Sequence, residues 1–269
     1  MSKLICSLLL FFVILYSLTG CTRQYTMSTS ITVAGSTTMA PLMRQLALAY
    51  PYANIEIQEL GTTAGINATI SGTSHISMSS RVVTSDELAM GLVAMPIAKD
   101  GIVVIVHPNN PVTNLSIYQI QGIFEGYISN LAQIGGHNAS LTIVSREEGS
   151  GARSSFDNFA NIQNLRRDMQ LIISQGSGAV INAVRTNPQA IGYIASGLIT
   201  SDVRALSING VHFSEISANS GDYPFTTAFY IVLPTEPTSY AKDFVNWIIS
   251  PKGQAIVRQL GYIPIGYVE

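Results

Sequence analysis

The chain has 269 residues, of which 47% are hydrophobic and 11% are charged, and its formal net charge is −2. An average protein carries about 25% charged residues, so this sparse and slightly acidic charge excludes a basic surface for nucleic acid. The four histidines are scattered and both cysteines lie near the N-terminus, which argues against a metal site. No cofactor is expected.

The N-terminus predicts export and lipidation. The apolar residues 4–18 have the length of a signal-peptide core, about 15 residues, and fall short of the roughly 20 residues of a spanning helix. The tetrapeptide Leu18-Thr19-Gly20-Cys21 resembles a bacterial lipobox, which implies cleavage before Cys21 and a lipid on its sulfur. An uncleaved anchor with an incidental cysteine is the alternative. We expect a signal peptide at residues 1–20, a linker at 21–30 and an extracytoplasmic protein anchored to the membrane.

Beyond the linker, strand-like and helix-like segments alternate. Short β-branched runs predict strands, and apolar residues at helical spacing predict helices. The expected strands are residues 31–34, 54–60, 76–79, 102–106, 141–144, 191–194 and 227–233. The expected helices are residues 40–50, 64–71, 117–124, 154–159, 178–185 and 240–260, the last as one helix or as two broken at Pro251. The alternation predicts an α/β fold with a largely parallel sheet.

Four loops at the ends of expected strands combine glycine with hydroxyl side chains. They are Gly35-Ser36-Thr37-Thr38, Gly61-Thr62-Thr63-Ala64-Gly65, Ser77-Met78-Ser79-Ser80-Arg81 and the nine residues from Ser145 to Arg153. The carboxyl ends of parallel strands meet at one edge of a sheet, and the first N–H groups of a helix attract anions. Ordinary helix capping explains each loop alone. Together with the guanidinium of Arg146, the loops favour a small, desolvated oxyanion.

Several further motifs follow one another in a fixed order. After the lipobox come Gly35-Ser36-Thr37-Thr38-Met39-Ala40-Pro41, Ser79-Ser80-Arg81, Ala98-Lys99-Asp100-Gly101-Ile102, the loop from Ser145 to Arg153, Gly176-Ser177-Gly178-Ala179-Val180, Asn187-Pro188-Gln189-Ala190-Ile191-Gly192-Tyr193, Ser250-Pro251-Lys252-Gly253-Gln254 and Gly261-Tyr262-Ile263-Pro264. In this order, over essentially the whole mature length, the chain resembles the phosphate-binding components of bacterial ABC phosphate importers, within the type II periplasmic binding protein family.

The resemblance implies a two-lobed α/β fold of the type II periplasmic binding protein kind, with two hinge crossovers near Asp100-Gly101 and near residues 223–227. The first lobe would comprise residues 31–99 and 227–269, and the second lobe residues 100–226. It also implies a monomer that captures inorganic phosphate between its lobes and passes it to the membrane subunits of an ABC permease, without catalysis.

The resemblance also implies a set of binding residues, with two departures from the family pattern. The family's phosphate contacts fall on Thr37, Thr38, Thr62, Ser80, Arg146, Ser150, Gly151 and Ala152, with Ser36 and Arg81 beside them. Ala152 stands where members often have threonine, so only its backbone N–H can serve. Ser80 stands where some members have an aspartate that takes the proton of hydrogen phosphate and rejects sulfate; a serine hydroxyl can also accept that proton. Asp100 is expected to be a surface turn residue rather than such an acceptor.

Two alternative functions stay open. A protein of the same fold that binds sulfate, molybdate or an organic phosphate is the alternative within the class. An exported serine hydrolase is the enzyme alternative, but Ser150 lies outside a Gly-x-Ser-x-Gly motif and the spacing of the histidines nominates no base. The adjacent Glu147 and Glu148 are expected to orient Arg146 or to hold the two lobes, rather than to act as acid and base.

Overall fold

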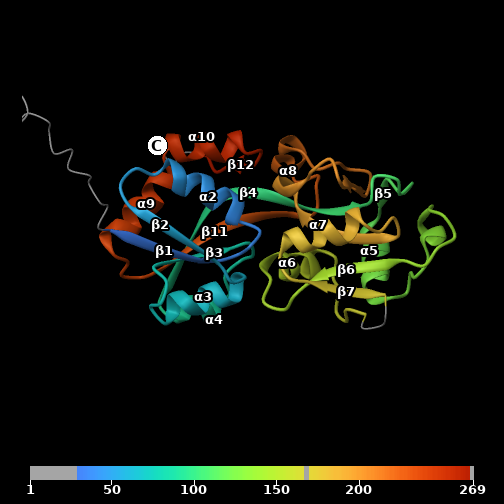
Figure 1. The fold of residues 1–269 in the computed structure, drawn as a ribbon, viewed down its shortest axis with the longest axis horizontal. Helices are drawn as coiled ribbons and strands as arrows, with labels where there is room; N and C mark the ends of the chain where they lie inside the picture. Colours follow the sequence, from blue (N-terminus) through green and yellow to red (C-terminus); the bar gives the residue numbers. More distant parts are fainter. Residues whose placement is uncertain (1–28, 167–169, 267–269) are drawn as a thin grey trace, which may run out of the picture.

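The computed structural model describes residues 29–166 and 170–266. The predicted signal peptide, the predicted lipidation site Cys21 and most of the predicted linker lie outside these residues. In the described part of the chain, no helix is long and apolar enough to cross a lipid bilayer. Two lobes lie side by side along the long axis of the molecule, and long strands connect them (Figure 1).

The first lobe is a small sheet with helices on both faces. Its strands are β1 (Ser30–Gly35), β2 (Asn54–Glu59), β3 (Ile76–Ser79) and β12 (Ile263–Pro264), and its helices are α2 (Ala40–Ala49), α3 (Thr62–Ile70), α4 (Ser85–Ala89), α9 (Ser239–Ile249) and α10 (Pro251–Gln259). β1 pairs in parallel with both β2 and β3. Buried side chains of α2 and α9, including Leu42 and Phe244, cluster with Ile31 and Val33 of β1. This apolar cluster fixes the position of the loop that follows β1.

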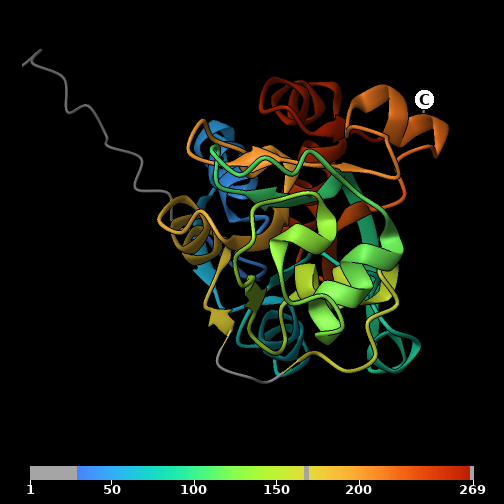
Figure 2. The same cartoon turned by 90° about the vertical axis from the view of Figure 1, so that its right-hand side faces the viewer.

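The second lobe repeats this plan. Its strands are β5 (Asn114–Leu115), β6 (Thr142–Arg146), β7 (Leu171–Ser174), β8 (Ala190–Ala195), β9 (Arg204–Ala205) and β10 (Ser207–Ile208); its helices are α5 (Ile117–Glu125), α6 (Gly151–Phe159), α7 (Ser177–Arg185) and α8 (Glu215–Ser220), with short 3₁₀ turns η1 (Leu131–Ile134) and η2 (Ser196–Leu198). β6 pairs in parallel with β7 and β8. Phe124, Phe156 and Val180 pack in a separate core. The green segments around α5 lie at the outer end of this lobe (Figure 2).

Two long strands pass between the lobes. β4 (Leu92–Val106) pairs with β11 (Thr226–Pro234) up to Gly101 and with β8 from Ile102 onward. Both pairings are antiparallel, as is that of β11 with β3. The expected two-lobed α/β fold with two crossovers is confirmed. The sheet is less uniformly parallel than expected, because β4 leads from the first lobe to the second whereas β11 returns in the opposite direction.

Asp100 is not the surface turn residue that its sequence context suggested. It lies within β4 at the crossover and is fully buried. Its Oδ1 accepts hydrogen bonds from Gly101 N, at 2.8 Å, and from the hydroxyl of Ser196. Burial raises the pKa of this carboxyl to about 7. An Asp-Gly pair usually marks a turn, but here the strand continues through both residues. Glycine is required at position 101 because a Cβ there would overlap the ring of Phe213.

Candidate anion-binding site

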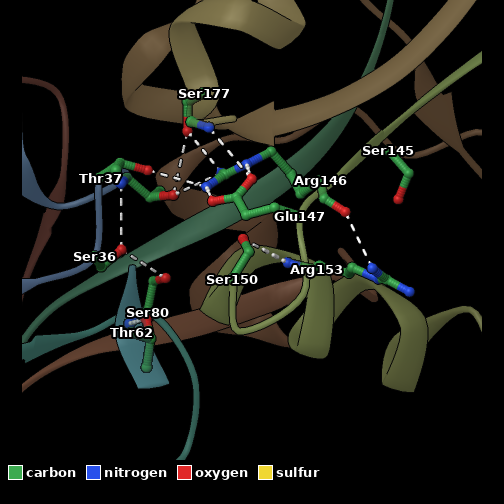
Figure 3. Close-up of polar contacts among 12 residues, drawn as sticks. Ser36, Thr37, Thr62, Ser80, Ser145, Arg146, Glu147, Ser150, Arg153 and Ser177 are labelled. Atoms are coloured by element: carbon green, nitrogen blue, oxygen red, sulfur yellow. Dashed lines mark hydrogen bonds and ion pairs between the residues drawn. The ribbon is translucent and has the colours of Figure 1, made fainter. Parts of the chain in front are cut away.

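The loops predicted to bind an anion meet between the two lobes. Ser36 follows β1, Thr62 begins α3 and Ser80 follows β3, so these three come from the first lobe. Arg146 ends β6 and Ser150 caps α6, so these two come from the second. Figure 3 shows the two groups of side chains facing each other. The arrangement follows from the parallel ladders, which bring the carboxyl ends of β1, β3 and β6 to the cleft.

Close backbone packing holds the first-lobe loops together. Gly35 has a φ of +136°, a conformation that favours glycine, and a Cβ there would overlap the carbonyl of Met78. A Cβ on Gly65 would overlap the backbone of Gly35. The N–H of Ser36 donates to the carbonyl of Met78 at 3.0 Å. The first turn of α3 therefore lies directly against the end of β1, which places Thr62 near Ser36.

A chain of hydrogen bonds orients the buried hydroxyls of the first lobe. Ser36 Oγ donates to Ser80 Oγ at 2.8 Å, and Ser36 Oγ in turn accepts from Thr38 N at 3.2 Å. Thr62 Oγ1 accepts from Ser80 N at 3.4 Å. Ser80 and Thr62 thus each accept a bond from the protein, and neither hydroxyl proton is used in these bonds. Those two protons can point at an acceptor in the cleft, such as an oxyanion.

The start of α6 supplies backbone donors from the second lobe. Ser150 is the N-cap, and its Oγ accepts from Arg153 N at 3.3 Å. Gly151 and Ala152 are the first two helical residues, so their N–H groups have no acceptor within the helix and lie at its positive end. A Cβ on Gly151 would overlap Thr62 Oγ1 and Ser80 Oγ. The helix start therefore lies against the first-lobe hydroxyls only because this residue is glycine.

Arg146 forms the other wall of the site and contacts both lobes. Its side chain is 2% exposed. Nη2 donates to Thr37 Oγ1 at 3.0 Å, and Nη1 donates to Thr38 Oγ1 at 3.4 Å and to Ser177 Oγ at 3.1 Å. Nε and Nη2 also donate to the two carboxylate oxygens of Glu147, at 2.8 and 2.7 Å. A guanidinium held this rigidly suits recognition of a tetrahedral oxyanion.

Glu147 stays ionised beside Arg146. Burial opposes its ionisation, but the hydrogen bonds and the charge of Arg146, with a further bond from Gly176 N, outweigh burial and hold the pKa of this carboxyl below its usual value. Glu147 therefore orients the guanidinium, as the sequence suggested. The adjacent Glu148 is exposed.

The backbone of Arg146 is also fixed from both sides. Its N–H donates to Tyr193 Oη at 3.2 Å, and its carbonyl accepts from Arg153 Nη1 at 3.2 Å. The ring of Tyr193 stacks on Phe156 of α6, with ring centroids 3.9 Å apart. Burial raises the pKa of Tyr193 well above its ordinary value, so the phenol remains a neutral hydrogen-bonding group. Packing in the second-lobe core thus fixes the backbone position from which the Arg146 side chain extends.

The structure brings together nine of the ten side chains and backbone groups nominated from the sequence and leaves one aside. Ser36, Thr37, Thr38, Thr62, Ser80, Arg146, Ser150, Gly151 and Ala152 lie close together where the two lobes meet. Arg81 instead forms an ion pair with Glu87 at 2.7 Å and donates to Thr63 Oγ1 at 3.3 Å. The hydrogen bonds and charge of Arg81, with a bond from Thr84, outweigh burial and lower the pKa of Glu87. Arg81 therefore lines the edge of the cleft without joining the hydroxyl cluster.

Sequence reasoning missed Ser177 as a member of the site. It begins α7, and its Oγ bonds Arg146 Nη1 and lies 3.2 Å from Thr38 Oγ1. A signal was present, because Gly176-Ser177-Gly178 repeats the Gly-Ser-Gly of residues 149–151 at the start of another helix. Thr37, Glu147 and Ser177 also border a groove of about 1550 Å³ between the lobes. The Arg146 side of the site therefore faces this groove.

Other chemistry has less support in the cleft. Residues 29–166 and 170–266 contain no group of three or more His, Cys, Asp or Glu side chains that could hold a metal ion. His75, the first histidine of the chain, bonds Thr32 N through Nδ1 and Tyr240 Oη through Nε2. The Oγ of Ser150 is engaged as a helix cap rather than with a histidine base. What the arrangement offers is a cluster of hydroxyl, N–H and guanidinium hydrogen-bond donors where the two lobes meet.

Known proteins with similar sequences are named as phosphate-binding proteins. A family model described as a PBP superfamily domain matches residues 22–252. The phosphate-binding protein PstS of Bacillus subtilis is 31% identical over 246 residues, which cover 88% of this chain and 81% of that protein. The protein of the same name from Borreliella burgdorferi is 26% identical over 250 residues, which cover 87% and 90% of the two chains.

Two solved structures that are similar to this one also belong to proteins named for phosphate transport. A candidate phosphate ABC transporter substrate-binding protein from Clostridium perfringens, solved with bound phosphate, is 35% identical and has a TM-score of 0.85, covering 88% of this chain and 100% of that one. An ABC-type phosphate transport receptor from Vibrio cholerae is 29% identical with a TM-score of 0.74, covering 87% and 100%. The two-lobed fold is therefore shared with these proteins.

Proposed function

The chain belongs to the PBP superfamily, has the type II periplasmic binding protein fold and is similar to phosphate-binding proteins, and from this premise we propose that it captures inorganic phosphate between its lobes and delivers it to an ABC permease. One observation carries the proposal. Arg146, from the second lobe, is buried and donates to Thr37 and Thr38 of the first. An anion at this place would be bound by both lobes at once, and its binding would favour their closure.

The proposed phosphate contacts are the residues nominated from the sequence, with Ser177 added and Arg81 given a lesser part. They are Ser36, Thr37, Thr38, Thr62, Ser80, Arg146, Ser150, Gly151, Ala152 and Ser177. Hydroxyl and N–H donors can satisfy the oxygens of a desolvated anion, while one guanidinium supplies charge-assisted bonds. Hinge bending would occur at the two crossovers, between a lobe of residues 31–99 with 227–269 and a lobe of residues 100–226.

The same proposal gives the protein a place in the cell. It is an extracytoplasmic monomer, made with a signal peptide at residues 1–20 and a linker at 21–30, and attached to the membrane through a lipid on Cys21. The lipobox resemblance supports the anchor. Acid-resistant fatty-acid labelling should appear on the full chain and disappear in Cys21→Ser. Labelling that persists in the variant would remove the anchor from the proposal without affecting the phosphate site.

Titration calorimetry of the full chain in detergent tests the ligand. Phosphate should bind with one site per chain, and the binding should survive excess sulfate and molybdate. Preference for sulfate or molybdate would mean that the ligand is another oxyanion. This outcome is worth testing because Ser80 is not a carboxylate. No catalysis is part of the proposal, since the relatives are transport components. Esterase turnover that is abolished in Ser150→Ala would instead favour a hydrolase.

A further inference from the structure

Two adjacent serines on α6 make hydrogen bonds of different kinds. Ser154 Oγ donates to the carbonyl of Ser150, at 3.2 Å, within its own helix. Ser155 Oγ donates across the cleft to the carbonyl of Ser80, also at 3.2 Å. Ser155 is 8% exposed and Ser80 is 1% exposed. The two side chains thus have the same chemistry and neighbouring positions, but only one of them joins the lobes.

Ser80 is held from three sides, and only one of the three bonds crosses the cleft. Its N–H donates to Thr62 Oγ1 and its Oγ accepts from Ser36 Oγ, and both of these bonds lie within the first lobe. The bond from Ser155 to its carbonyl comes from the second lobe. When the lobes separate, the first two bonds remain and the third is lost. The backbone of Ser80, and with it the Ser80 hydroxyl, is therefore held by all three bonds only when the lobes are closed.

A second contact of this kind joins the start of α3 to the loop before α6. The N–H of Thr63 donates to the carbonyl of Gly149, at 3.2 Å. Thr63 follows Thr62 and Gly149 precedes Ser150, so this bond links the neighbours of two proposed phosphate contacts. Thr63 is the second residue of α3 and has no acceptor within its helix. Its amide is therefore bonded when the lobes are closed and loses its partner when they open.

These two contacts differ from those of Arg146. The guanidinium donates to Thr37 and Thr38, and an anion would compete for the same donors. Ser155 Oγ and the N–H of Thr63 donate to backbone carbonyls of the opposite lobe, and neither residue is among the proposed phosphate contacts. Both bonds are therefore compatible with an occupied site. They add to closure without using the groups that recognise the ligand.

We infer that Ser155 is a positioning residue, which couples closure of the lobes to the placement of the Ser80 hydroxyl and slows release of the bound anion. The inference rests on the proposed function in naming phosphate as that anion. A buried hydrogen bond between neutral groups changes an equilibrium by roughly 3- to 10-fold. Because the bond forms as the lobes close, its loss affects dissociation of the ligand rather than the first encounter.

The test compares Ser155→Ala with Ser154→Ala in the full chain. Ser155→Ala should raise the Kd for inorganic phosphate roughly 3- to 10-fold through faster dissociation, with no decrease in the association rate constant. Ser154→Ala removes the same hydroxyl from the same helix without touching the other lobe, and its Kd should stay within about twofold of wild type. Equal Kd values for the two variants would overturn the inference, as would a slower association in Ser155→Ala with unchanged dissociation.

Hydrogen exchange of the Thr63 amide tests the same inference without phosphate. In the ligand-free protein this amide should exchange faster in Ser155→Ala than in wild type or Ser154→Ala, since lobe opening becomes more frequent. Identical exchange at Thr63 in all three proteins would overturn the role in closure. If wild type fails to bind phosphate while the exchange differs as expected, the proposed ligand is wrong and the closure role of Ser155 stands.

Discussion

Glu147 accepts two hydrogen bonds from Arg146, at 2.7 Å from Nη2 and at 2.8 Å from Nε. Its Oε2 also accepts from the N–H of Gly176, at 3.2 Å, just before α7. The carboxylate, the guanidinium and the start of α7 are therefore one unit. Because the charges of the pair offset each other, an anion in the cleft would be stabilised mainly by oriented donors and not by a large excess of positive charge.

Replacement of the Glu147 carboxylate should destabilise the ligand-free protein more than the phosphate complex. In Glu147→Gln, the buried Arg146 loses its charged partner, and the free energy of unfolding should fall by roughly 1.5–3 kcal/mol, the range for hydrogen bonds to charged groups. Bound phosphate would partly replace Glu147 as the negatively charged partner of the Arg146 guanidinium. Urea unfolding with and without saturating phosphate should therefore show a smaller difference from wild type in the presence of the anion.

Glu148→Gln is the matched control for this experiment. Glu148 is the next residue and borders the same groove, but it is exposed. Its replacement should change the free energy of unfolding by less than about 0.5 kcal/mol. Equal stabilisation of Glu147→Gln and wild type by phosphate would contradict a role of Glu147 as the partner of Arg146 in the ligand-free site.

The two arginines nominated from the sequence should differ sharply in binding. Arg146→Ala removes a buried charge that the anion would contact, and the binding free energy for phosphate should weaken by about 2 to 5 kcal/mol. Arg81→Ala removes a guanidinium already paired with Glu87, and its effect on binding should stay below about 1 kcal/mol. Titration calorimetry of both variants decides the point, and similar losses would mean that Arg81 turns toward the ligand when phosphate binds.

Gly151→Ala should disfavour closure while leaving the separate lobes intact. The added Cβ would overlap Thr62 Oγ1 and Ser80 Oγ. Those hydroxyls cannot move aside freely, because Thr62 accepts from Ser80 N and Ser80 accepts from Ser36. Overpacking of this kind costs about 1–3 kcal/mol, so the Kd for phosphate should rise roughly 10- to 100-fold. Thermal unfolding of the ligand-free protein should change little, since the lobes can open.

Gly178→Ala provides the comparison. Gly178 is the last glycine of the second Gly-Ser-Gly, at the start of α7, and a Cβ there would meet no heavy atom within 4 Å. This variant should bind phosphate like wild type. If both alanine variants bind normally, the closed arrangement of α6 against Thr62 and Ser80 is not the one that holds the ligand.

Local patterns predicted much of the fold. The β-branched run of β1 and the glycine-hydroxyl loop after it correspond to a strand end and a helix start, as do Ser150 and α6. The first half of β4 was missed because Pro96 and several exposed residues interrupt its pattern, and its antiparallel pairing with β11 depends on residues more than 120 positions away. The break at Pro251, one of the two alternatives for the last helices, separates α9 from α10.

The residue types of the site could be predicted from the sequence, but the partners of each side chain could not. Arg146 lies 109 residues from Thr37 in sequence, and only the fold brings the two together. Arg81 was nominated for its charge, yet Glu87, six residues later and at the start of α4, pairs with it. Asp100 was predicted to be a surface turn residue, whereas it is buried within β4 and accepts a hydrogen bond from Ser196, 96 residues away in the sequence. These outcomes rest on long-range packing, which a local motif does not contain.

Asp100 should make the stability of the protein depend on pH. Its carboxyl is fully buried, and its Oδ2 has no hydrogen-bond partner among the residues that the structure describes. Burial raises the pKa from 3.8 to about 7, despite hydrogen bonds from Ser196 and Gly101 that favour the charged form. Between these two values the folded protein holds a proton that the unfolded chain has released. Stability from this group is therefore complete below about pH 4 and is lost as the pH rises through about 7.

Asp100→Asn keeps a neutral side chain at every pH and should remove this dependence. At pH 4 the variant and wild type should have similar free energies of unfolding. As the pH rises to 8 the variant should become the more stable protein, by on the order of 4 kcal/mol, since each pKa unit corresponds to about 1.4 kcal/mol. Urea unfolding at several pH values in the absence of phosphate measures the difference without titration of the ligand. Asp86→Asn, on the exposed first turn of α4, should leave the pH profile as in wild type. A constant difference between Asp100→Asn and wild type from pH 4 to 8 would mean that the buried carboxyl titrates alike in the folded and unfolded states.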